Sequence, residues 1–490
     1  MAILIHNTKG NRKEKLQPLE DNHVKMYVCG VTVYDYCHIG HARSALIFDL
    51  IFRYLRHRGY RVTFVRNFTD IDDKIIKRAQ EQGTSCEELS RRFIKMFQED
   101  MTALGIEPPT LEPLATEHIT EMIALIKQLI DQGLAYEAGG DVYYRVQHFA
   151  GYGELSGRSL EDMQAGARVA INDNKEHLMD FVLWKAGKSG EPSWKSPWGA
   201  GRPGWHLECS AMSKKYLGET FDIHGGGKDL IFPHHENEIA QSEGVSGKSF
   251  ANIWIHHGFV TVKDEKMSKS LGNFLTIREA LARYSVEALR LFIFSIHYRN
   301  PLDYSEAAMA DAETSLTRLY TALATIAGLP TAGDPGVRSQ INNRDREKLE
   351  KLEERFHQAM DIDFNSALAL GRIFDAVKII NKLRQVLPFT PAPQDLNLLR
   401  SAAAKIQELA GIFGLLTENP ALYLQNRKEK MLARLDIEPA VIEKLIASRQ
   451  AARQNQDWAE ADRIRDQLTS QHIAIKDGPE GTTWEVLREH

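Results

Sequence analysis

The stretch that decides the fold runs from Val24 to Phe68 and reads VKMYVCGVTVYDYCHIGHARSALIFDLIFRYLRHRGYRVTFVRNF. Its first segment, Val24–Cys29, alternates well enough to be a strand and is followed by a glycine. Residues Gly40–Arg58 have the apolar spacing of a helix, with a glycine directly after them, and Tyr60–Phe68 is rich in strand-forming residues. A strand, a helix and a strand at this spacing form a βαβ unit, which predicts a parallel sheet.

The sequence beyond this unit predicts a second half of the sheet. Thr69-Asp70 is expected to start a helix, Thr220–His224 is a short strand, and a helix is expected from about His234 to Glu243. A hairpin is predicted within Leu134–Val146. We expect an α/β fold, with a doubly wound, Rossmann-type parallel sheet that carries an insertion, followed by an α-helical C-terminal half.

Six parts are expected along the chain. They are the first half of the sheet domain (1–110), the connective insertion (111–200), the second half of the sheet domain (201–275), a helical junction (276–330), a helical bundle (331–430) and a small C-terminal domain (431–490). Within the last part, Pro439–Leu468 is expected to be helical, and the end is expected to form a hairpin.

Composition excludes several classes of protein. The net charge of −5 and the pI of about 6.4 argue against a bulk nucleic-acid binder, so any RNA contact must come from local patches. Four cysteines in 490 residues are too few for a disulfide scaffold. Met1–Gly10 lacks the apolar core of a signal peptide, and no apolar run approaches the roughly 18 residues of a membrane span. We therefore expect a cytoplasmic protein with no membrane association, whose reduced thiols are free to bind metal.

The first chemical motif is His38-Ile39-Gly40-His41, between a strand and the start of a helix. A helix N-terminus offers unpaired N–H groups and partial positive charge, so it attracts phosphate. The two histidines can both reach an anion there, and Gly40 lets a nucleotide approach the backbone. The alternative is that both histidines are capping or surface residues.

The second motif is Lys266-Met267-Ser268-Lys269-Ser270, in a polar stretch that is expected to be a loop. Two lysines on a mobile loop can close over a triphosphate and neutralise developing charge. The alternative is a solvated basic loop.

Together the two motifs resemble the HIGH and KMSKS signatures of class I aminoacyl-tRNA synthetases, letter for letter and in the expected order. The resemblance implies that His38 and His41 stabilise the reacting α-phosphate of ATP. It also implies that Lys266 and Lys269 hold the pyrophosphate as it leaves.

A third group of residues bears on the amino acid. Cys29 ends the first strand, Cys209 lies in GRPGWHLECS (201–210), and His234 and Glu238 are four residues apart on an expected helix. Two thiolates, an imidazole and a carboxylate are suitable zinc ligands. The spacing alone leaves two alternatives open: the cysteines can be small buried apolar residues, and His235 competes with His234.

The segments around these residues resemble the blocks of cysteinyl-tRNA synthetases: MYVCGVTVYD before CHIGH, GRPGWHLECS, and FDIHGGGKDLIFPHHENE (221–238). The resemblance implies one zinc in the amino-acid pocket, held by Cys29, Cys209, His234 and Glu238. It also places Thr69, Trp205 and His224 in the cysteine pocket. Each of these three has a structural alternative, as a helix cap, a core aromatic residue and a core histidine. Because serine and cysteine are near-isosteres, a sulfur-preferring metal would provide the discrimination that a steric pocket lacks.

The C-terminal stretch RQNQDWAEADRIRDQL (453–468) with KDGPEGTTW (476–484) resembles the anticodon-binding end of the same family. The resemblance implies anticodon contacts from Arg453, Trp458, Asp462 and Asp477. The alternative is a small helical domain with Trp458 in its core.

The resemblance implies a monomer that activates L-cysteine with ATP and Mg²⁺ and transfers it to tRNA(Cys). Two other functions compete. One is a cysteine ligase of the mycothiol pathway, which acts on an amino-sugar and lacks the anticodon-binding end. The other is a non-catalytic tRNA-binding paralogue, which would have lost a HIGH histidine or a KMSKS lysine.

Overall fold

The computed structural model describes residues 2–161, 174–263, 265–267, 274–435, 437–478 and 481–486. Lys269 and the rest of the KMSKS motif after Met267 lie outside the described residues. The chain divides into two compact units, of which the first comprises 1–314, 342–379 and 404–415 and the second comprises 315–341, 380–403 and 416–490. The six expected parts stay a prediction.

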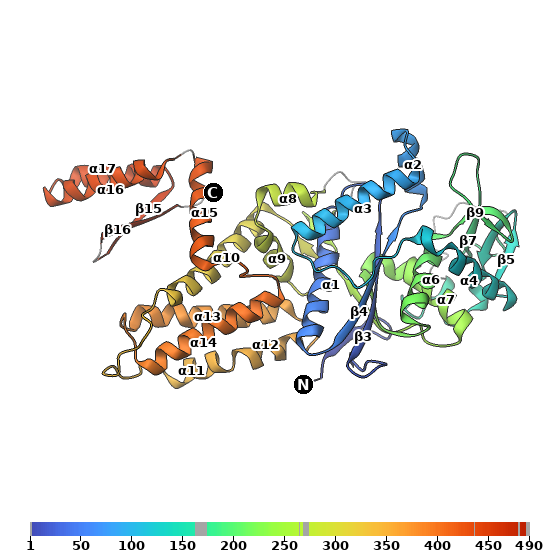
Figure 1. The fold of residues 1–490 in the computed structure, drawn as a ribbon, viewed down its shortest axis with the longest axis horizontal. Helices are drawn as coiled ribbons and strands as arrows, with labels where there is room; N and C mark the ends of the chain where they lie inside the picture. The colour runs from blue at the N-terminus through green and yellow to red at the C-terminus, as the bar shows by residue number, and fades with distance from the viewer. Residues whose placement is uncertain are drawn as a thin grey trace. The chain divides into compact units, whose positions relative to one another are not determined.

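The first unit is built on a four-stranded parallel sheet with the order β11-β10-β3-β4. Its strands are β3 (His23–Thr32), β4 (Arg61–Thr69), β10 (Phe221–Gly227) and β11 (Ala251–His257). Figure 1 shows α1 (Ile39–His57) on one side of the sheet and α6 (Trp205–Leu217) and α7 (Glu236–Ser246) on the other. The predicted α/β fold with a doubly wound parallel sheet is therefore confirmed.

The first half of strand β3 is largely buried because helices cover both faces of the sheet. Val24, Met26, Tyr27 and Val28 are all buried, although they point to alternate faces. Burial on both sides explains why the apolar residues of this strand do not alternate strictly with polar ones.

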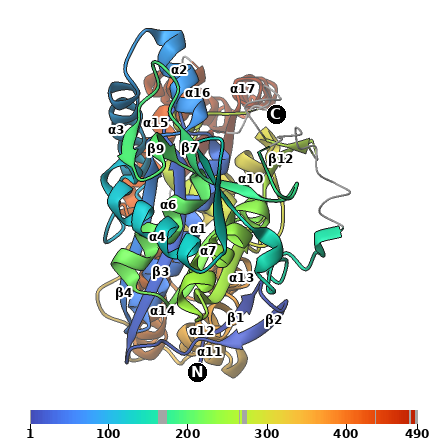
Figure 2. The same ribbon diagram turned by 90° about the vertical axis from the view of Figure 1, so that its right-hand side faces the viewer.

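The insertion consists of α4 (Ile119–Asp131) and a five-stranded antiparallel sheet with the order β5-β6-β7-β9-β8. Its strands are β5 (Ala135–Ala138), β6 (Asp141–Tyr144), β7 (Phe181–Ala186), β8 (Trp194–Ser196) and β9 (Gly199–Pro203). The hairpin predicted within 134–146 is confirmed. Helix α4 packs against α6 and α7, on the side of the unit that faces the viewer in Figure 2.

The remaining helices and strands are shorter elements of the first unit and the helices of the C-terminal half. They are β1 (Leu4–Asn7), β2 (Arg12–Lys15), α2 (Asp73–Gln82), α3 (Cys86–Ala103), β12 (Val260–Val262), β13 (Glu265–Lys266), α8 (Ile277–Arg283), α9 (Val286–Phe294), β14 (Leu302–Asp303), α10 (Glu306–Ala327), α11 (Asn343–Glu350), α12 (Leu352–Met360), α13 (Ser366–Val386), α14 (Pro393–Ile412), α15 (Pro420–Leu435), α16 (Pro439–Gln454), α17 (Trp458–Ser470), β15 (Ile473–Gly478) and β16 (Gly481–Val486). No helix in the described residues is long and apolar enough to cross a membrane.

Two expected helices differ from the structure. Thr69 ends strand β4 and does not start a helix, because Asp72 provides the N-cap by accepting from the backbone N–H of Lys74. The helix expected over 439–468 is two helices, α16 and α17. Gln456 has a φ of 62°, which ends α16, and the Asp457 side chain caps α17.

Candidate active site

The order of the strands decides where a ligand can bind. The chain passes from β3 to β4 on one side of β3 and later crosses back to β10 on the other side. Open α/β sheets bind ligands at the carboxyl ends of the strands where the strand order reverses in this way. Cys29 lies in the second half of β3, toward its carboxyl end. It directly follows Val28, which pairs with Gly225 of β10. Helix α1, which carries the HIGH motif, begins after the same end of β3.

Four of the expected ligands meet at this position. The atoms of Cys29, Cys209, His234 and Glu238 that could bind a metal all lie within 4.8 Å of one another. Sγ of Cys29 is 3.5 Å from Sγ of Cys209 and 3.3 Å from Oε1 of Glu238. Nε2 of His234 is 3.0 Å from the same Glu238 oxygen. The structure therefore brings together residues that are up to 209 positions apart in the chain.

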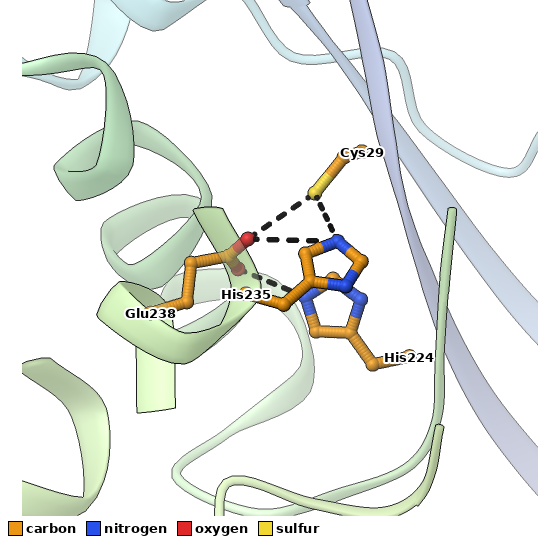
Figure 3. Close-up of side chains that lie close together, drawn as sticks. All are labelled: Cys29, His224, His235 and Glu238. Carbon is orange, nitrogen blue, oxygen red and sulfur yellow. Dashed lines mark hydrogen bonds and ion pairs between the residues drawn. The ribbon is translucent and has the colours of Figure 1, made fainter. Parts of the chain in front are cut away.

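A second group shares two of these ligands. Cys29, His224, His235 and Glu238 also lie within 4.8 Å of one another (Figure 3). Nε2 of His224 is 2.8 Å from Oε2 of Glu238, and Nε2 of His235 is 3.3 Å from Sγ of Cys29. Only Cys209 and His234 distinguish the first group from the second, so the competition between His234 and His235 stays open in this geometry.

The helix that carries His234 and Glu238 begins later than expected. α7 starts at Glu236, and His234 lies in the preceding turn, after the cis peptide bond between Phe232 and Pro233. The side chains of His234 and Glu238 nevertheless meet as an i, i+4 pair.

Burial and mutual contacts set the charges in the cluster. Burial raises the pKa of the Cys29 thiol well above its usual value. Burial also opposes ionisation of Cys209, but the hydrogen bond from Cys29 and the neighbouring His234 ring lower the pKa of its thiol to about 6. Burial likewise disfavours a charged His234, yet the Glu238 carboxylate raises the pKa of this ring to about 10. The cluster can thus hold a thiolate and a carboxylate together when a positive charge lies between them.

The donor set fits a zinc ion. Tetrahedral zinc with bonds of about 2.0–2.3 Å places its ligand atoms roughly 3.3–3.8 Å apart. The two sulfur atoms, and Cys29 Sγ with Glu238 Oε1, lie at 3.5 and 3.3 Å. Nε2 of His234 is fully buried and makes no hydrogen bond with the described residues, although Glu238 is close. A buried ring nitrogen that makes no hydrogen bond and faces two thiols and a carboxylate suits a metal ligand, because a bound ion would displace its proton.

Nδ1, the other ring nitrogen of His234, is held by a residue that sequence reasoning missed. It lies 2.9 Å from Nδ1 of His206, and the Trp205 ring stacks on His234 with 4.1 Å between centroids. Burial lowers the pKa of His206 well below its usual value, which keeps that ring neutral. Such partners orient a metal-binding histidine. His206 directly follows Trp205, so its position in the same block was the available signal.

The other predicted pocket residues lie around the cluster. Thr69 is buried and donates a hydrogen bond to Glu208 Oε2 at 2.6 Å, and His224 bonds Glu238 and stacks on Trp254. Glu208 is a second residue that the sequence did not indicate, because nothing in its spacing marks a buried carboxyl group. Burial raises its pKa well above the usual value.

A half-open cavity of about 780 Å³ lies beside Trp205 and His206. Its walls come from the insertion sheet, α2 and the turn before α7, and include Arg202 and Phe232. A cavity of this size can accommodate a small substrate.

The HIGH histidines cap α1 in this structure. His38 is the N-cap, its Nδ1 accepts from the Gly40 N–H, and His41 Nδ1 accepts from the His38 N–H. A Cβ at position 40 would lie 2.7 Å from the His38 ring, so the ring requires glycine there. The two rings lie 4.0 Å apart at the start of the helix.

The segment after the KMSKS motif returns to the same helix end. The Ile39 N–H donates to Leu275 O, and the Ile277 N–H donates to Cys37 O. Lys266 lies over the Phe259 ring, with 4.1 Å to its centroid, and 3.1 Å from Asp229. Backbone pairing thus fixes the end of the KMSKS loop beside the HIGH motif.

The four residues expected to contact an anticodon lie in the second unit. Trp458, the first residue of α17, is 60% exposed, so the alternative that it belongs to a core is wrong. The core of this region comes from Leu432, Ile442, Ile446, Ile464, Leu468 and Ile473.

The charged residues of this region pair with one another. Asp477 accepts hydrogen bonds from Arg449, at 2.8 and 2.9 Å, and from Arg453. The Arg449 guanidinium holds the pKa of Asp477 far below its usual range. Asp462 pairs with Arg465 at 3.0 Å. Arg449 is a partner that sequence reasoning did not single out.

Models of known families match most of the chain. A model described as the tRNA synthetase class I (C) catalytic domain matches residues 15–314. A DALR domain model matches 355–417, and a model described as the cysteinyl-tRNA ligase anticodon binding domain matches 438–484.

Several curated relatives match over their full length. A cysteine–tRNA ligase of Desulfotalea psychrophila is 62% identical over 488 residues, which cover 100% of both chains. Proteins of the same name from Geobacter sulfurreducens and Geotalea daltonii are 53% and 52% identical, each over 99% of this chain and 100% of the relative.

Among solved structures, a methionyl-tRNA synthetase of Mycobacterium tuberculosis bound by methionyl-adenylate matches with a TM-score of 0.60. It is 18% identical, and the match covers 79% of this chain and 91% of that one. This likeness supports the class I synthetase fold. With the family models and the full-length identity to named relatives, the sequence and the fold lead to one conclusion: this chain belongs to the cysteine–tRNA ligase family of class I aminoacyl-tRNA synthetases.

Proposed function

We propose that Cys29, Cys209, His234 and Glu238 bind the zinc ion that recognises the substrate thiol in the reaction of this cysteine–tRNA ligase. The reaction activates L-cysteine with ATP to cysteinyl-adenylate and transfers it to tRNA(Cys). The observation that carries the proposal is the convergence of two thiols, an imidazole and a carboxylate, from three separate segments, on one buried point. A bound zinc would supply a borderline-soft Lewis acid that prefers sulfur to oxygen.

The first ligand group supports the proposal better than the second. Its two thiols suit a sulfur-selective metal, and the Nδ1 contact of His234 with His206 leaves Nε2 directed at the cluster. His235 also has a partner, since its Nδ1 is 2.8 Å from Nε2 of His256, so this feature alone does not separate the histidines. The buried Nε2 of His234, which makes no hydrogen bond with the described residues, favours His234.

The residues around the metal would orient the amino acid. Trp205, which stacks on His234 and lines the cavity, would cover the substrate, while Thr69 and His224 would act from buried positions. Because Thr69 donates to Glu208 and His224 bonds Glu238, both would act mainly by holding the side chains of these two glutamates.

The HIGH and KMSKS residues would act on ATP, which we expect to bind with Mg²⁺. His38, Gly40 and His41 form the first turn of α1, where N–H groups and the helix dipole favour the reacting α-phosphate. Lys266, together with Lys269 outside the described residues, would neutralise the pyrophosphate. The capping contacts of the two histidines would then have to adjust when ATP binds.

In the second unit, Trp458 is the strongest candidate for a base contact because its ring is exposed at the start of a helix. Aromatic rings stack on the unpaired bases of RNA loops. Arg453, Asp462 and Asp477 would contribute hydrogen bonds, with Asp477 held in place by Arg449. The match to an anticodon binding domain supports this part and disfavours the amino-sugar ligase.

Two assays test the proposal. Cysteine-dependent exchange between ATP and pyrophosphate measures activation, and charging of purified tRNA(Cys) measures transfer. Removal of the metal by a chelator should abolish discrimination against serine, and zinc should restore it. Metal-free protein that activates cysteine and rejects serine would refute the role of the metal.

We also propose that the protein is a cytoplasmic monomer with the six parts given above. Light scattering can test the oligomeric state, and limited proteolysis can test the boundaries of the parts.

A further inference from the structure

A group of three side chains lies apart from the active site, in the first unit, where the end of α1 meets α12. Nε2 of His57 is 3.4 Å from Nε2 of His357, which is 3.7 Å from Oε1 of Glu353. Each residue offers one ligand atom, and the three atoms lie within 4.8 Å of one another. The α1 helix of 19 residues separates His57 from the HIGH motif by roughly 27 Å.

Neighbouring hydrogen bonds favour one tautomer of His357. The Tyr54 hydroxyl donates its proton to Asp361 Oδ1 at 2.7 Å, because a carboxylate only accepts. Tyr54 Oη accepts from Arg58 Nη1 at 3.1 Å, and its remaining lone pair can accept from Nδ1 of His357, which lies 3.3 Å away. With its proton on Nδ1, a neutral His357 ring presents the lone pair of Nε2 to His57 and Glu353.

A lysine side chain orients the carboxylate of Glu353. Its Oε2 lies 2.9 Å from Nζ of Lys405, which also pairs with Glu408 at 2.7 Å. Oε1 of Glu353 is thus turned toward the lone pair of His357 Nε2. A proton on His57 Nε2 can satisfy only one of these two acceptors, whereas a cation between the three atoms satisfies all of them.

The spacing and the charges suit a divalent transition metal. Tetrahedral zinc with nitrogen and oxygen ligands places them roughly 3.3–3.5 Å apart, close to the two distances given above. Around the group, the carboxylates of Glu353, Glu408 and Asp361 face the cations Arg58 and Lys405. This set carries a surplus of one negative charge.

We propose that His57, Glu353 and His357 form a second metal site, which binds a divalent ion of the zinc class with water as the remaining ligand. His57 is exposed and the other two residues are partly exposed, so the site is open to water. Imidazole and carboxylate ligands without sulfur suit zinc, nickel and copper. The ion would tie the end of the catalytic helix α1 to α12 of the helical half.

The experiment counts zinc on the full-length protein by equilibrium dialysis and elemental analysis. His57→Gln removes one ligand at an exposed position, and His148→Gln, at another exposed histidine, is the matched control. We expect the variant His57→Gln to bind one zinc ion fewer per chain, or the second ion at least about tenfold more weakly, with His148→Gln unchanged. Glu353→Gln, whose folding is checked by circular dichroism, should give the same loss.

X-ray absorption identifies which ion is lost. The second equivalent of zinc should have only nitrogen and oxygen neighbours, and Cys209→Ser should not affect it, because that residue belongs to the active-site group. Equal zinc stoichiometry and affinity in wild type and His57→Gln would overturn the proposal, as would sulfur neighbours around the second ion. Loss of the active-site zinc alone would leave the count at the second site unchanged, so the two proposals fail separately.

Discussion

Replacing Cys209 with serine separates the two ligand groups of the active site. Cys209 belongs only to the group with His234, whereas His224 and His235 belong only to the other group. Cys209 is 2% exposed and lies 3.5 Å from Sγ of Cys29 and 3.7 Å from Oδ1 of Asn67. A serine hydroxyl keeps polar neighbours there, so we expect the free energy of unfolding of the metal-free protein to change by no more than about 1 kcal/mol.

The expected effect on zinc is much larger. Binding of zinc to four protein ligands is worth about 10–16 kcal/mol, so an equal share for each ligand is about 2.5–4 kcal/mol. At about 1.4 kcal/mol for each factor of ten, loss of one thiolate weakens zinc binding by roughly 10²–10³-fold. Discrimination between cysteine and serine should fall with it, while ATP still binds.

A competition titration with a zinc chelator measures the affinity, and pyrophosphate exchange with cysteine and with serine measures discrimination. Cys86→Ser is the matched control, since Cys86 is a partly buried thiol outside both groups. His235→Gln should retain zinc. If Cys209→Ser binds zinc as wild type does and His235→Gln loses it, the ligands are those of the second group, and the reasoning from His234 is wrong.

Three further changes test other parts of the site. Lys269→Ala should slow adenylate formation by about 10²–10³-fold with cysteine binding nearly unchanged, because one preorganised charge is lost. Pyrophosphate exchange at the wild-type rate would contradict the proposed role of Lys269. Trp458→Ala should weaken tRNA binding by about 1–3 kcal/mol, measured as KM for tRNA, because its exposed ring stacks on a base. Cysteine activation and the unfolding midpoint should not change, and an unchanged KM for tRNA would exclude stacking. Deletion of residues from about 430 onward should spare activation and reduce charging, with circular dichroism as the folding control; unchanged charging would show that this end is dispensable.

The sequence by itself determined the local pattern of the sheet domain. Periodicity and glycines predicted β3, α1 and β4 within one to three residues at each end, and the pattern of Leu134–Val146 predicted the hairpin of the insertion. These features depend on contacts between neighbours in the chain. The HIGH and KMSKS motifs, and the blocks that resemble cysteinyl-tRNA synthetases, could also be recognised in the sequence because the residues of each are contiguous.

Secondary-structure boundaries failed where a side chain competed with periodicity. Helix α2 begins later in the chain than predicted because Asp72 is its N-cap. The positive φ of Gln456 divides a continuous apolar pattern into α16 and α17. The sequence also left open whether Trp458 was buried. Its exposure depends on which residues fill the small core of that region, which is a property of packing.

Only the tertiary structure decided which residues meet. Cys29 and Cys209 are 180 positions apart, and His57 and His357 are 300 positions apart, so no local spacing could pair them. The structure showed that Glu208 is the partner of Thr69 and that His206 is the partner of His234. The physical reason is that periodicity reports which face of an element is buried, whereas the order of strands and the packing of helices decide what that face contacts.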